Sequence, residues 1–431
     1  MQSKLFTPYQ LGPITLRNRT IRSAAFENMA YGNKPSDDLK NYHVAVARGG
    51  VGMTTVAYCA VDRTGVSFDG QLYVHDDIKP AMKELTDAIH AEGAKASIQL
   101  GHCGNMTHRA TCLCTPMGPS SGFNLYSPTF YRGITKDEIH TIVRHFGEAV
   151  DWSRDCGFDC VEIHCGHAYL ISQFINPGLN HRKDEYGGNL TNRMRFMQEV
   201  LTEVMKHSHN KEGKRDIAVV VKMNMTDGYR GGMSMTEGVE VARAIHAHGV
   251  DGIILSAGTV SHTPMLILGG AMPLRALGHY MDWAKFWWLK IGLAIGGRIV
   301  IPTQPYHELY FLEWAKRFLR DVPGANFIYV GGIQSRRNCE TVLDAGFELM
   351  QMAHVLIEDP TFVNHMQEAE QSDTQSALDY RSLCHRSNYC VGRMYTKNMA
   401  CHKCVENMPK CLQREIDAAE AVNTRLNAWP S

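Results

Sequence analysis

Short apolar segments alternate with amphipathic helical segments eight times along the sequence, and this alternation restricts the chain to very few folds. The apolar segments have the length of buried strands, and each helical pattern places apolar residues on one face. The expected strands are residues 20–24, 53–57, 95–100, 160–163, 217–223, 252–256, 327–330 and 349–352. Eight such units predict an α/β fold of the parallel (β/α)₈, or TIM, barrel type.

A doubly wound open sheet would show a similar alternation. Such a sheet normally has a glycine-rich phosphate-binding turn after its first strand. Here the first strand is followed by Ala25, Phe26, Glu27 and Asn28, which contain no such turn. The chain length of 431 residues also suits a barrel with insertions, since these barrels run from about 200 to over 400 residues.

Two segments extend this barrel. We expect residues 1–373 to form the barrel and residues 374–431 to form a cysteine-containing, helical extension. The segment of about 262–322, between strands six and seven, is longer than an ordinary connection. Within it, residues 281–297 form an apolar helical pattern with three of the six Trp. This pattern predicts a helix packed on the barrel wall or on a dimer partner, or else a lid over a wide apolar pocket; a peripheral membrane helix is a weaker alternative.

Composition excludes several classes of function. The 44 Lys and Arg balance the 44 Asp and Glu, so no net charge attracts nucleic acid or an anionic membrane. No run of about 18 uncharged apolar residues is present, and the first residues lack the apolar core of a secretory signal. The 13 cysteines are odd in number and scattered, which favours reduced thiols. We therefore expect a cytoplasmic homo-oligomer that binds a small-molecule substrate.

One long motif resembles a known family. Residues 157–196, GFDCVEIHCGHAYLISQFINPGLNHRKDEYGGNLTNRMRF, resemble the signature of the Old Yellow Enzyme family, the FMN-dependent ene-reductases built on a (β/α)₈ barrel. LFTPYQLGPITLRNR near the start, ASIQLGHCG in strand three and YVGGI in strand seven are similar to other segments of the family. The resemblance covers about residues 5–360 and includes the barrel of 2,4-dienoyl-CoA reductase-like members. It implies FMN as cofactor and NADH or NADPH as co-substrate.

The resemblance also assigns the catalytic residues. His164 and His167 match the pair that binds the substrate's carbonyl oxygen, and Tyr169 matches the proton donor. In this chemistry a hydride adds to the β-carbon of an α,β-unsaturated carbonyl compound, negative charge grows on the oxygen, and two imidazoles stabilise it. A phenol then supplies the α-proton. The implied function is an ene-reductase that reduces an activated C=C bond, with a bulky apolar enone as one candidate substrate.

The implied flavin-binding residues lie at the ends of the predicted strands. Gln99 matches the residue facing the flavin pyrimidine, and Lys222 stands where many members have an Arg beside N1 and O2. In two places the chain departs from the family: no Thr or Cys follows strand one, and His354 replaces the Arg that binds phosphate after strand eight, although His is a weaker phosphate partner. The full predicted set is Ala24, Ala25, Ala60, Gln99, Lys222, Gly331, Gly332, Ala353 and His354.

The extension contains a broken cluster motif. Residues 384–390 resemble the C-x-x-C-N-x-C run of relatives that carry a [4Fe–4S] cluster, but Ser387 stands in the second ligand position, where a thiolate is needed. We therefore expect no metal; an iron–sulfur cluster is disfavoured, and a zinc site is a further alternative. The cysteines concerned are Cys384, Cys390, Cys401, Cys404 and Cys411.

Two other functions remain open from the sequence. One is an amine demethylase-like flavoprotein dehydrogenase, whose members differ in the strand-four His pair and pass electrons to a cluster. The other is a flavin-binding barrel without catalytic activity. The intact set of His164, His167 and Tyr169 favours the ene-reductase over both.

Overall fold

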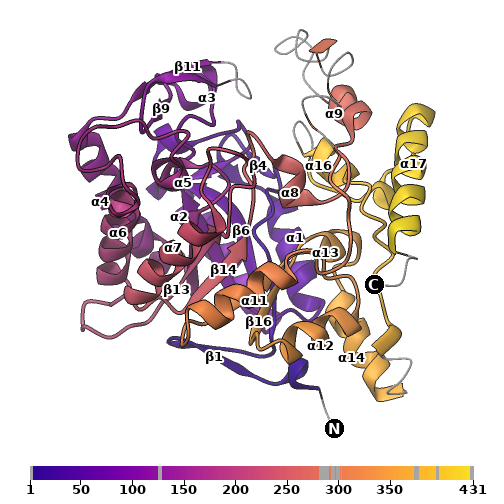
Figure 1. The fold of residues 1–431 in the computed structure, drawn as a ribbon. Coiled ribbons are helices and arrows are strands. Elements are labelled where there is room, and N and C mark those ends of the chain that lie inside the picture. The colour runs from indigo at the N-terminus through magenta and orange to yellow at the C-terminus, as the bar shows by residue number, and fades with distance from the viewer. Residues whose placement is uncertain are drawn as a thin grey trace.

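The computed structural model describes residues 3–124, 129–280, 291–292, 297, 301, 303–372, 378–394 and 398–427. Its centre is a closed barrel of eight parallel strands, which confirms the predicted (β/α)₈ architecture (Figure 1). The barrel closes where Ile21 of the first strand lies opposite Met53 of the second. In chain order the barrel strands are β3 (Thr20–Arg22), β6 (Met53–Ala60), β8 (Lys95–Gly101), β12 (Cys160–Cys165), β13 (Ala218–Asn224), β14 (Gly252–Ser256), β15 (Phe327–Val330) and β16 (Leu349–Met352).

Each predicted strand overlaps an observed one, with two notable differences at the ends. β3 ends at Arg22, although the Ser23 N–H still donates to the Met352 carbonyl of β16 (2.8 Å). β6 continues to Ala60 and also pairs with the short β7 (Leu72–Tyr73). β6 therefore extends three residues further toward the C-terminal end of the barrel than the predicted strand 53–57.

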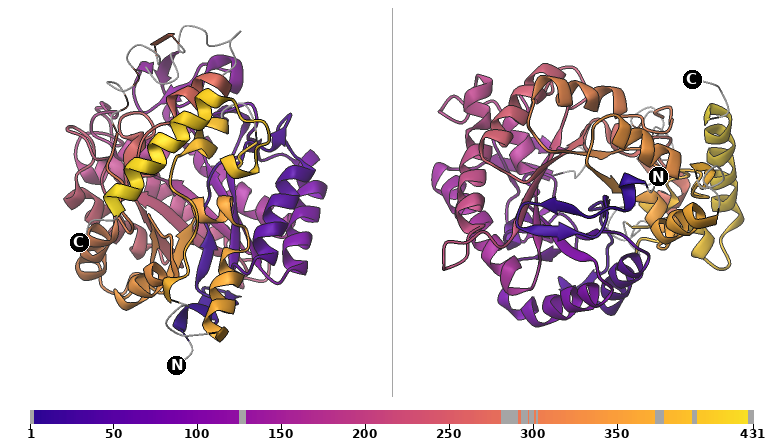
Figure 2. Two further views of the ribbon diagram at one scale, coloured as in Figure 1. Left: turned by 90° about the vertical axis from the view of Figure 1, so that its right-hand side faces the viewer. Right: turned by 90° about the horizontal axis from the view of Figure 1, so that it is seen from below.

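Helices surround the barrel, as the view along its axis shows (Figure 2). Thr135 and Glu138 form a capping box at the start of α4, with Glu138 accepting from the Thr135 N–H (2.9 Å). This box satisfies backbone groups that the first turn leaves unpaired. The outer helices are α1 (Asp37–Arg48), α2 (Lys79–Ala91), α4 (Lys136–Asp155), α6 (Leu190–His207), α7 (Met235–Ala247), α11 (Leu312–Asp321), α12 (Arg336–Asp344) and α14 (Phe362–Ser372).

The N-terminal end of the barrel is closed by a hairpin of β1 (Tyr9–Leu11) and β2 (Ile14–Leu16), visible across the barrel from below (Figure 2). Leu11, Ile14 and Leu16 pack against the lowest layer of inward side chains, which includes Met53 and Ile254. This plug is apolar and buried. The C-terminal ends of the strands are therefore the place where a ligand can enter.

Short elements build the loops around the barrel. They are η1 (Lys4–Phe6), β4 (Ala30–Tyr31), β5 (Lys34–Pro35), η2 (Arg63–Gly65), η3 (Asp76–Ile78), α3 (Arg109–Cys112), β9 (Met117–Gly118), β10 (Gly122–Asn124), β11 (Thr129–Gly133), α5 (Leu170–Ile175) and α13 (His354–Glu358). None of the described helices is long and apolar enough to cross a membrane.

The insertion and the extension pack against each other near the C-terminal end of the barrel (Figure 1). The Glu415 carboxylate accepts from the Ala276 N–H (3.0 Å), and the Tyr280 and Tyr389 hydroxyls are hydrogen-bonded. The Trp-rich pattern 281–297 lies outside the described residues except for 291, 292 and 297. The described helices of these segments are α8 (Pro264–Leu268), α9 (Leu274–Tyr280), α16 (Tyr389–Arg393), η4 (His402–Cys404) and α17 (Lys410–Asn427).

Candidate active site

A cavity of about 1900 Å³ opens at the C-terminal ends of the barrel strands. Eleven of the twelve predicted site residues line it: Ala24, Ala25, Gln99, His164, His167, Tyr169, Lys222, Gly331, Gly332, Ala353 and His354. Ala60 does not line the cavity. It is fully buried inside β6, where its carbonyl accepts from the Val74 N–H (2.8 Å). The extra length of β6 thus places Ala60 within the barrel wall.

The three predicted catalytic side chains form one cluster. The ring centroids of His164 and His167 lie 5.1 Å apart, and those of His164 and Tyr169 lie 4.7 Å apart. His164 projects from β12 beside Lys222 of β13, its partner in the strand register. Tyr169 stacks on Tyr58 of β6 with 5.1 Å between ring centroids. Three strands therefore hold the cluster together.

The loop after β12 has an unusual backbone. His167 and Ala168 both have positive φ, 59° and 64°, a region that costs most non-glycine residues free energy. Asn224 holds the loop by accepting the His167 N–H (3.1 Å), and the Ser256 hydroxyl lies 2.7 Å from His167 Nε2. Two neighbouring strands thus fix the position and orientation of this imidazole.

Both imidazoles are held neutral. Burial lowers the pKa of His164 well below its usual value, and the nearby His167 and Lys222 lower it further. Burial and Lys222 likewise lower the pKa of His167 to about 3. The Gly166 N–H donates to His164 Nδ1 (3.4 Å), so the single proton of this ring lies on Nε2. A neutral His has one N–H to donate.

A buried polar layer lies beneath this cluster, at the centre of the barrel. The Glu162 carboxylate accepts from Gln99 Nε2 (2.6 Å) and Gln351 Nε2 (2.8 Å) and pairs with Lys222 Nζ (2.8 Å). Lys222 Nζ also lies 3.3 Å from the Ser23 hydroxyl. Glu162 and Gln351 are not among the site residues predicted from the sequence. The period-two alternation of inward side chains along β12 and β16 was the signal that could have found them.

A second group of polar residues lies at the ends of β15 and β16. Gly332 has φ 73°, and a Cβ there would lie 2.6 Å from the Leu309 nitrogen, so this turn requires glycine. Burial first, and then Arg386, lowers the pKa of His354 well below its usual value. Arg386 belongs to the C-terminal extension and lines the same end of the cavity. Arg386 was not among the predicted site residues, because no sequence motif around position 386 indicates a contact with the barrel.

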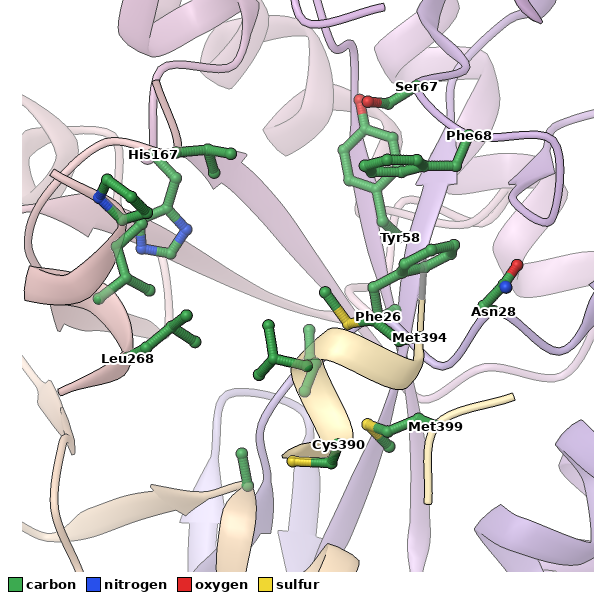
Figure 3. A pocket seen from close by; sticks show the side chains of 18 of the residues that line it. Phe26, Asn28, Tyr58, Ser67, Phe68, His167, Leu268, Cys390, Met394 and Met399 are labelled. Carbon is green, nitrogen blue, oxygen red and sulfur yellow. The ribbon is translucent and has the colours of Figure 1, made fainter. Parts of the chain in front are cut away.

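Apolar side chains form the rest of the wall. Phe26 stacks on Phe68 with ring centroids 5.3 Å apart. Figure 3 shows Phe26, Tyr58 and Phe68 on one side of the view and His167 and Leu268 on the other, with α16 between them. The extension contributes Cys390, Val391, Met394 and Met399 to the lining. It therefore forms part of the cavity rather than a separate unit beside it.

The cysteines of the extension differ in exposure. Cys401 is buried, Cys384 and Cys390 are half-buried, and Cys404 and Cys411 are exposed. Within the described ranges, no group of three or more His, Cys, Asp or Glu side chains is arranged to hold a metal ion.

The residues present fit a flavin mononucleotide. Gln99 and Lys222 supply an amide and a cation at the centre of the barrel, as the polar edge of a flavin needs. At the ends of β15 and β16, the glycine turn lies near the Arg386 guanidinium, whose Nε is buried and has no hydrogen-bond partner among the described residues. Phosphate sites after strands seven and eight are frequent in this barrel fold. Gln99 and Lys222 thus provide hydrogen-bond donors for the flavin ring, and Arg386 provides a cation for its phosphate group.

Comparison with known proteins agrees with this geometry. Residues 4–265 match the family described as NADH:flavin oxidoreductase / NADH oxidase. The chain is 35% identical over 393 residues to the 4,4'-dithiodibutanoate disulfide reductase of Rhodococcus erythropolis, covering 91% of this chain and 93% of that protein.

Two solved structures show the same fold. One is a 2-naphthoyl-CoA reductase complex, with a TM-score of 0.76 and 21% identity, covering 96% of this chain and 58% of that one. The other is the old yellow enzyme homologue from Zymomonas mobilis, with a TM-score of 0.65 and 18% identity, covering 91% and 99%. The chain belongs to the NADH:flavin oxidoreductase / NADH oxidase family, the Old Yellow Enzyme family, and is an FMN-dependent oxidoreductase.

Proposed function

We propose that this protein uses NADH or NADPH to reduce the C=C bond of an α,β-unsaturated carbonyl compound. The observation that carries this proposal is the cluster of His164, His167 and Tyr169 above the buried donors Gln99 and Lys222. When bound, FMN supplies the hydride that the protein itself cannot supply. The rest of the chemistry falls to side chains of this chain.

The flavin is held by groups from several strands. In this proposal Gln99 would bind the pyrimidine edge of the flavin, and the charge of Lys222 would stabilise the reduced cofactor. Ala24 and Ala25 contribute main-chain groups along the ring, and Gly331, Gly332 and Ala353 contribute main-chain groups near the phosphate. Each of these residues lines the cavity.

The substrate's carbonyl oxygen lies between the two imidazoles. His164 donates from Nε2, since Nδ1 accepts from Gly166. In the same role His167 donates from Nδ1, with the Ser256 hydroxyl donating to Nε2. Neutral imidazoles can perform this task, because each keeps one N–H that donates to the oxygen as negative charge grows on it.

Tyr169 supplies the proton. Its ring packs against both Tyr58 and His164, so the phenol is held beside the imidazoles that fix the substrate's oxygen. Protonation of the α-carbon then follows hydride addition to the β-carbon, and the C=C bond becomes C–C. A positioned general acid of this kind contributes roughly 10²–10⁴-fold.

The lining of the cavity favours a bulky apolar substrate. Its volume of about 1900 Å³ exceeds the roughly 300–1,000 Å³ of an ordinary ligand pocket, so it can hold both the flavin and a substrate. The wall opposite the strand ends comes from apolar residues of the insertion and the extension, among them Met272, Val391 and Met394. Burial of a large apolar ligand here yields about 25 cal/mol per Å².

Reduction of an organic disulfide is the second candidate. It is favoured by the 35% identity over 91% of this chain to a protein named as a disulfide reductase. Hydride transfer to a disulfide also leaves an anion, a thiolate, that two imidazole N–H groups stabilise. Both reactions therefore use the same site.

Turnover with NADH and NADPH against three substrate classes separates these functions. We expect oxidation of the co-substrate with a large cyclic enone, and the saturated ketone as product. Oxidation only with an organic disulfide would establish the second candidate. Oxidation of an amine would indicate the dehydrogenase alternative, and a colourless protein that binds no FMN would contradict the proposal.

A further inference from the structure

We propose that Arg386, in the C-terminal extension, binds the phosphate group of the flavin and replaces the arginine that the barrel lacks at His354. This inference rests on the proposed use of FMN at this site. It makes the extension a component of the cofactor site, which neither the family assignment nor the strand motifs indicate.

The guanidinium lies at the correct end of the cavity. Arg386 lines it together with the glycine turn after β15 and with His354 after β16. Tyr306 connects the two sides: its hydroxyl lies 3.5 Å from the Gly332 carbonyl, and the Arg386 guanidinium carbon lies 4.5 Å from the centre of its ring. The cation is therefore next to the turn that would hold a phosphate.

Arg386 has unused capacity to bind an anion. Its side chain is buried, Nη2 donates to the Leu268 carbonyl (2.8 Å), and Nε has no hydrogen-bond partner in the described part of the chain. No described carboxylate forms an ion pair with it; the neighbours that act on its charge are Tyr306, Tyr310 and two cysteines. A buried cation without a counter-charge is costly, and a bound phosphate removes that cost.

His354 cannot take this role. Its Nε2 lies 3.2 Å from Asn388 Oδ1, and an amide oxygen only accepts, so the one proton of the neutral ring is donated to Asn388. The orientation of the Asn388 amide is fixed, because Nδ2 donates to the carbonyls of Gly269 (2.7 Å) and Ala271 (3.2 Å). The remaining nitrogen of His354 is an acceptor and would repel a phosphate oxygen.

The extension holds Arg386 in place. Arg386 and Asn388 both have positive φ, 58° and 56°, which costs free energy that the surroundings must offset. Asn423 of α17 donates to the Arg386 carbonyl (3.1 Å). Packing of α17 and α16 against the insertion thus fixes the backbone from which the guanidinium reaches the cavity.

The test compares FMN with riboflavin, which has the same ring but no phosphate. Dissociation constants are measured by flavin fluorescence quenching for the wild type, Arg386→Gln, Arg386→Lys and, as a matched control, Arg381→Gln. We expect Arg386→Gln to weaken FMN binding by roughly 10- to 100-fold and to leave riboflavin binding unchanged. Arg386→Lys keeps the charge but loses the fork, so its FMN affinity should be intermediate. Arg381 is an exposed arginine of the extension that pairs with Glu308 away from the cavity lining, so Arg381→Gln should change the FMN to riboflavin ratio less than threefold.

A wild-type measurement supports the result independently of any variant's folding. Phenylglyoxal modifies arginine, and peptide mass spectrometry locates the adduct. Arg386 should be protected in the FMN complex and modified in the riboflavin complex. Equal modification in both complexes, or an unchanged FMN to riboflavin ratio in Arg386→Gln, overturns the inference while FMN binding by the wild type stands. A wild type that binds neither flavin would overturn the proposed function as well.

Discussion

The Glu162 carboxylate and the Lys222 ammonium lie 2.8 Å apart at the centre of the barrel, and both side chains are buried. Lys222 is therefore not a solvated residue at a strand end. Its position is fixed by a carboxylate that also orients Gln99 and Gln351. The cation proposed to act beside the flavin is thus held in place before any cofactor binds.

This pair makes Glu162→Gln a test of the polar layer. The substitution leaves Lys222 as a buried cation without its counter-charge, so we expect the free energy of unfolding to fall by about 3–5 kcal/mol. Urea unfolding of the purified variant measures this. The double variant Glu162→Gln with Lys222→Met should recover much of the loss, since no charge then remains unpaired. Equal stability of the wild type and the single variant would show that the pair is not coupled.

Tyr169→Phe should separate the two halves of the reaction. The ring remains stacked on Tyr58, so flavin reduction by NADH or NADPH should be nearly unchanged. Enone reduction should slow by roughly 10²–10⁴-fold, because the proton donor is lost. Nitroalkenes, whose product anion is stable, should still oxidise the reduced flavin, and stopped-flow absorbance follows both steps. Unaltered enone turnover would exclude Tyr169 as the acid.

His164→Ala and His167→Ala should each weaken oxyanion binding. We expect kcat for an enone to fall by roughly 10²–10³-fold in each variant, and titrations with p-hydroxybenzaldehyde, whose phenolate oxygen mimics the oxyanion, to show weaker binding. Asn at either position retains an N–H donor and should lose less than Ala. Phenol titrations that match the wild type in both Ala variants would exclude this role.

The low pKa of His167 predicts a specific dependence of stability on pH. The unfolded residue has a pKa near 6.5, whereas burial lowers the folded value to about 3. Between these values the unfolded state binds the extra proton, so the free energy of unfolding decreases as the pH falls, by up to about 1.4 kcal/mol per pH unit for this residue.

Urea unfolding of the wild type and His167→Gln at pH 7, 6 and 5 measures this contribution. The variant lacks the titrating group, so its stability should decrease less between pH 7 and pH 5. Parallel curves for the two proteins would contradict the assigned neutral state.

The sequence predicted the barrel well because its signals are local. Each apolar run and each helical pattern lies within one element, and β14, β15 and β16 coincide with the predicted segments. His164, His167 and Tyr169 are close together in the strand-four motif, and the structure places their side chains in one cluster.

The remaining features depend on contacts between distant residues. Ser256 reaches His167 from 89 positions away, and Gln351 reaches Glu162 from 189 positions away. Arg386 enters the cavity only because α16 and α17 pack on the insertion. Ala60 lies outside the cavity lining for a related reason, since the length of β6 depends on pairing with β7. No pattern within a short segment of the sequence predicts these contacts between distant residues.

The most direct test of the account is a single stopped-flow experiment. Enzyme whose FMN has been reduced anaerobically is mixed with a bulky cyclic enone, cyclohexenone or an organic disulfide, and flavin absorbance near 450 nm is followed while the products are identified. Fast reoxidation by the bulky enone, slower reoxidation by cyclohexenone and a saturated ketone as product are the predicted results. A flavin that stays reduced with both enones, and is reoxidised only by the disulfide, would contradict the proposed reduction of activated C=C bonds.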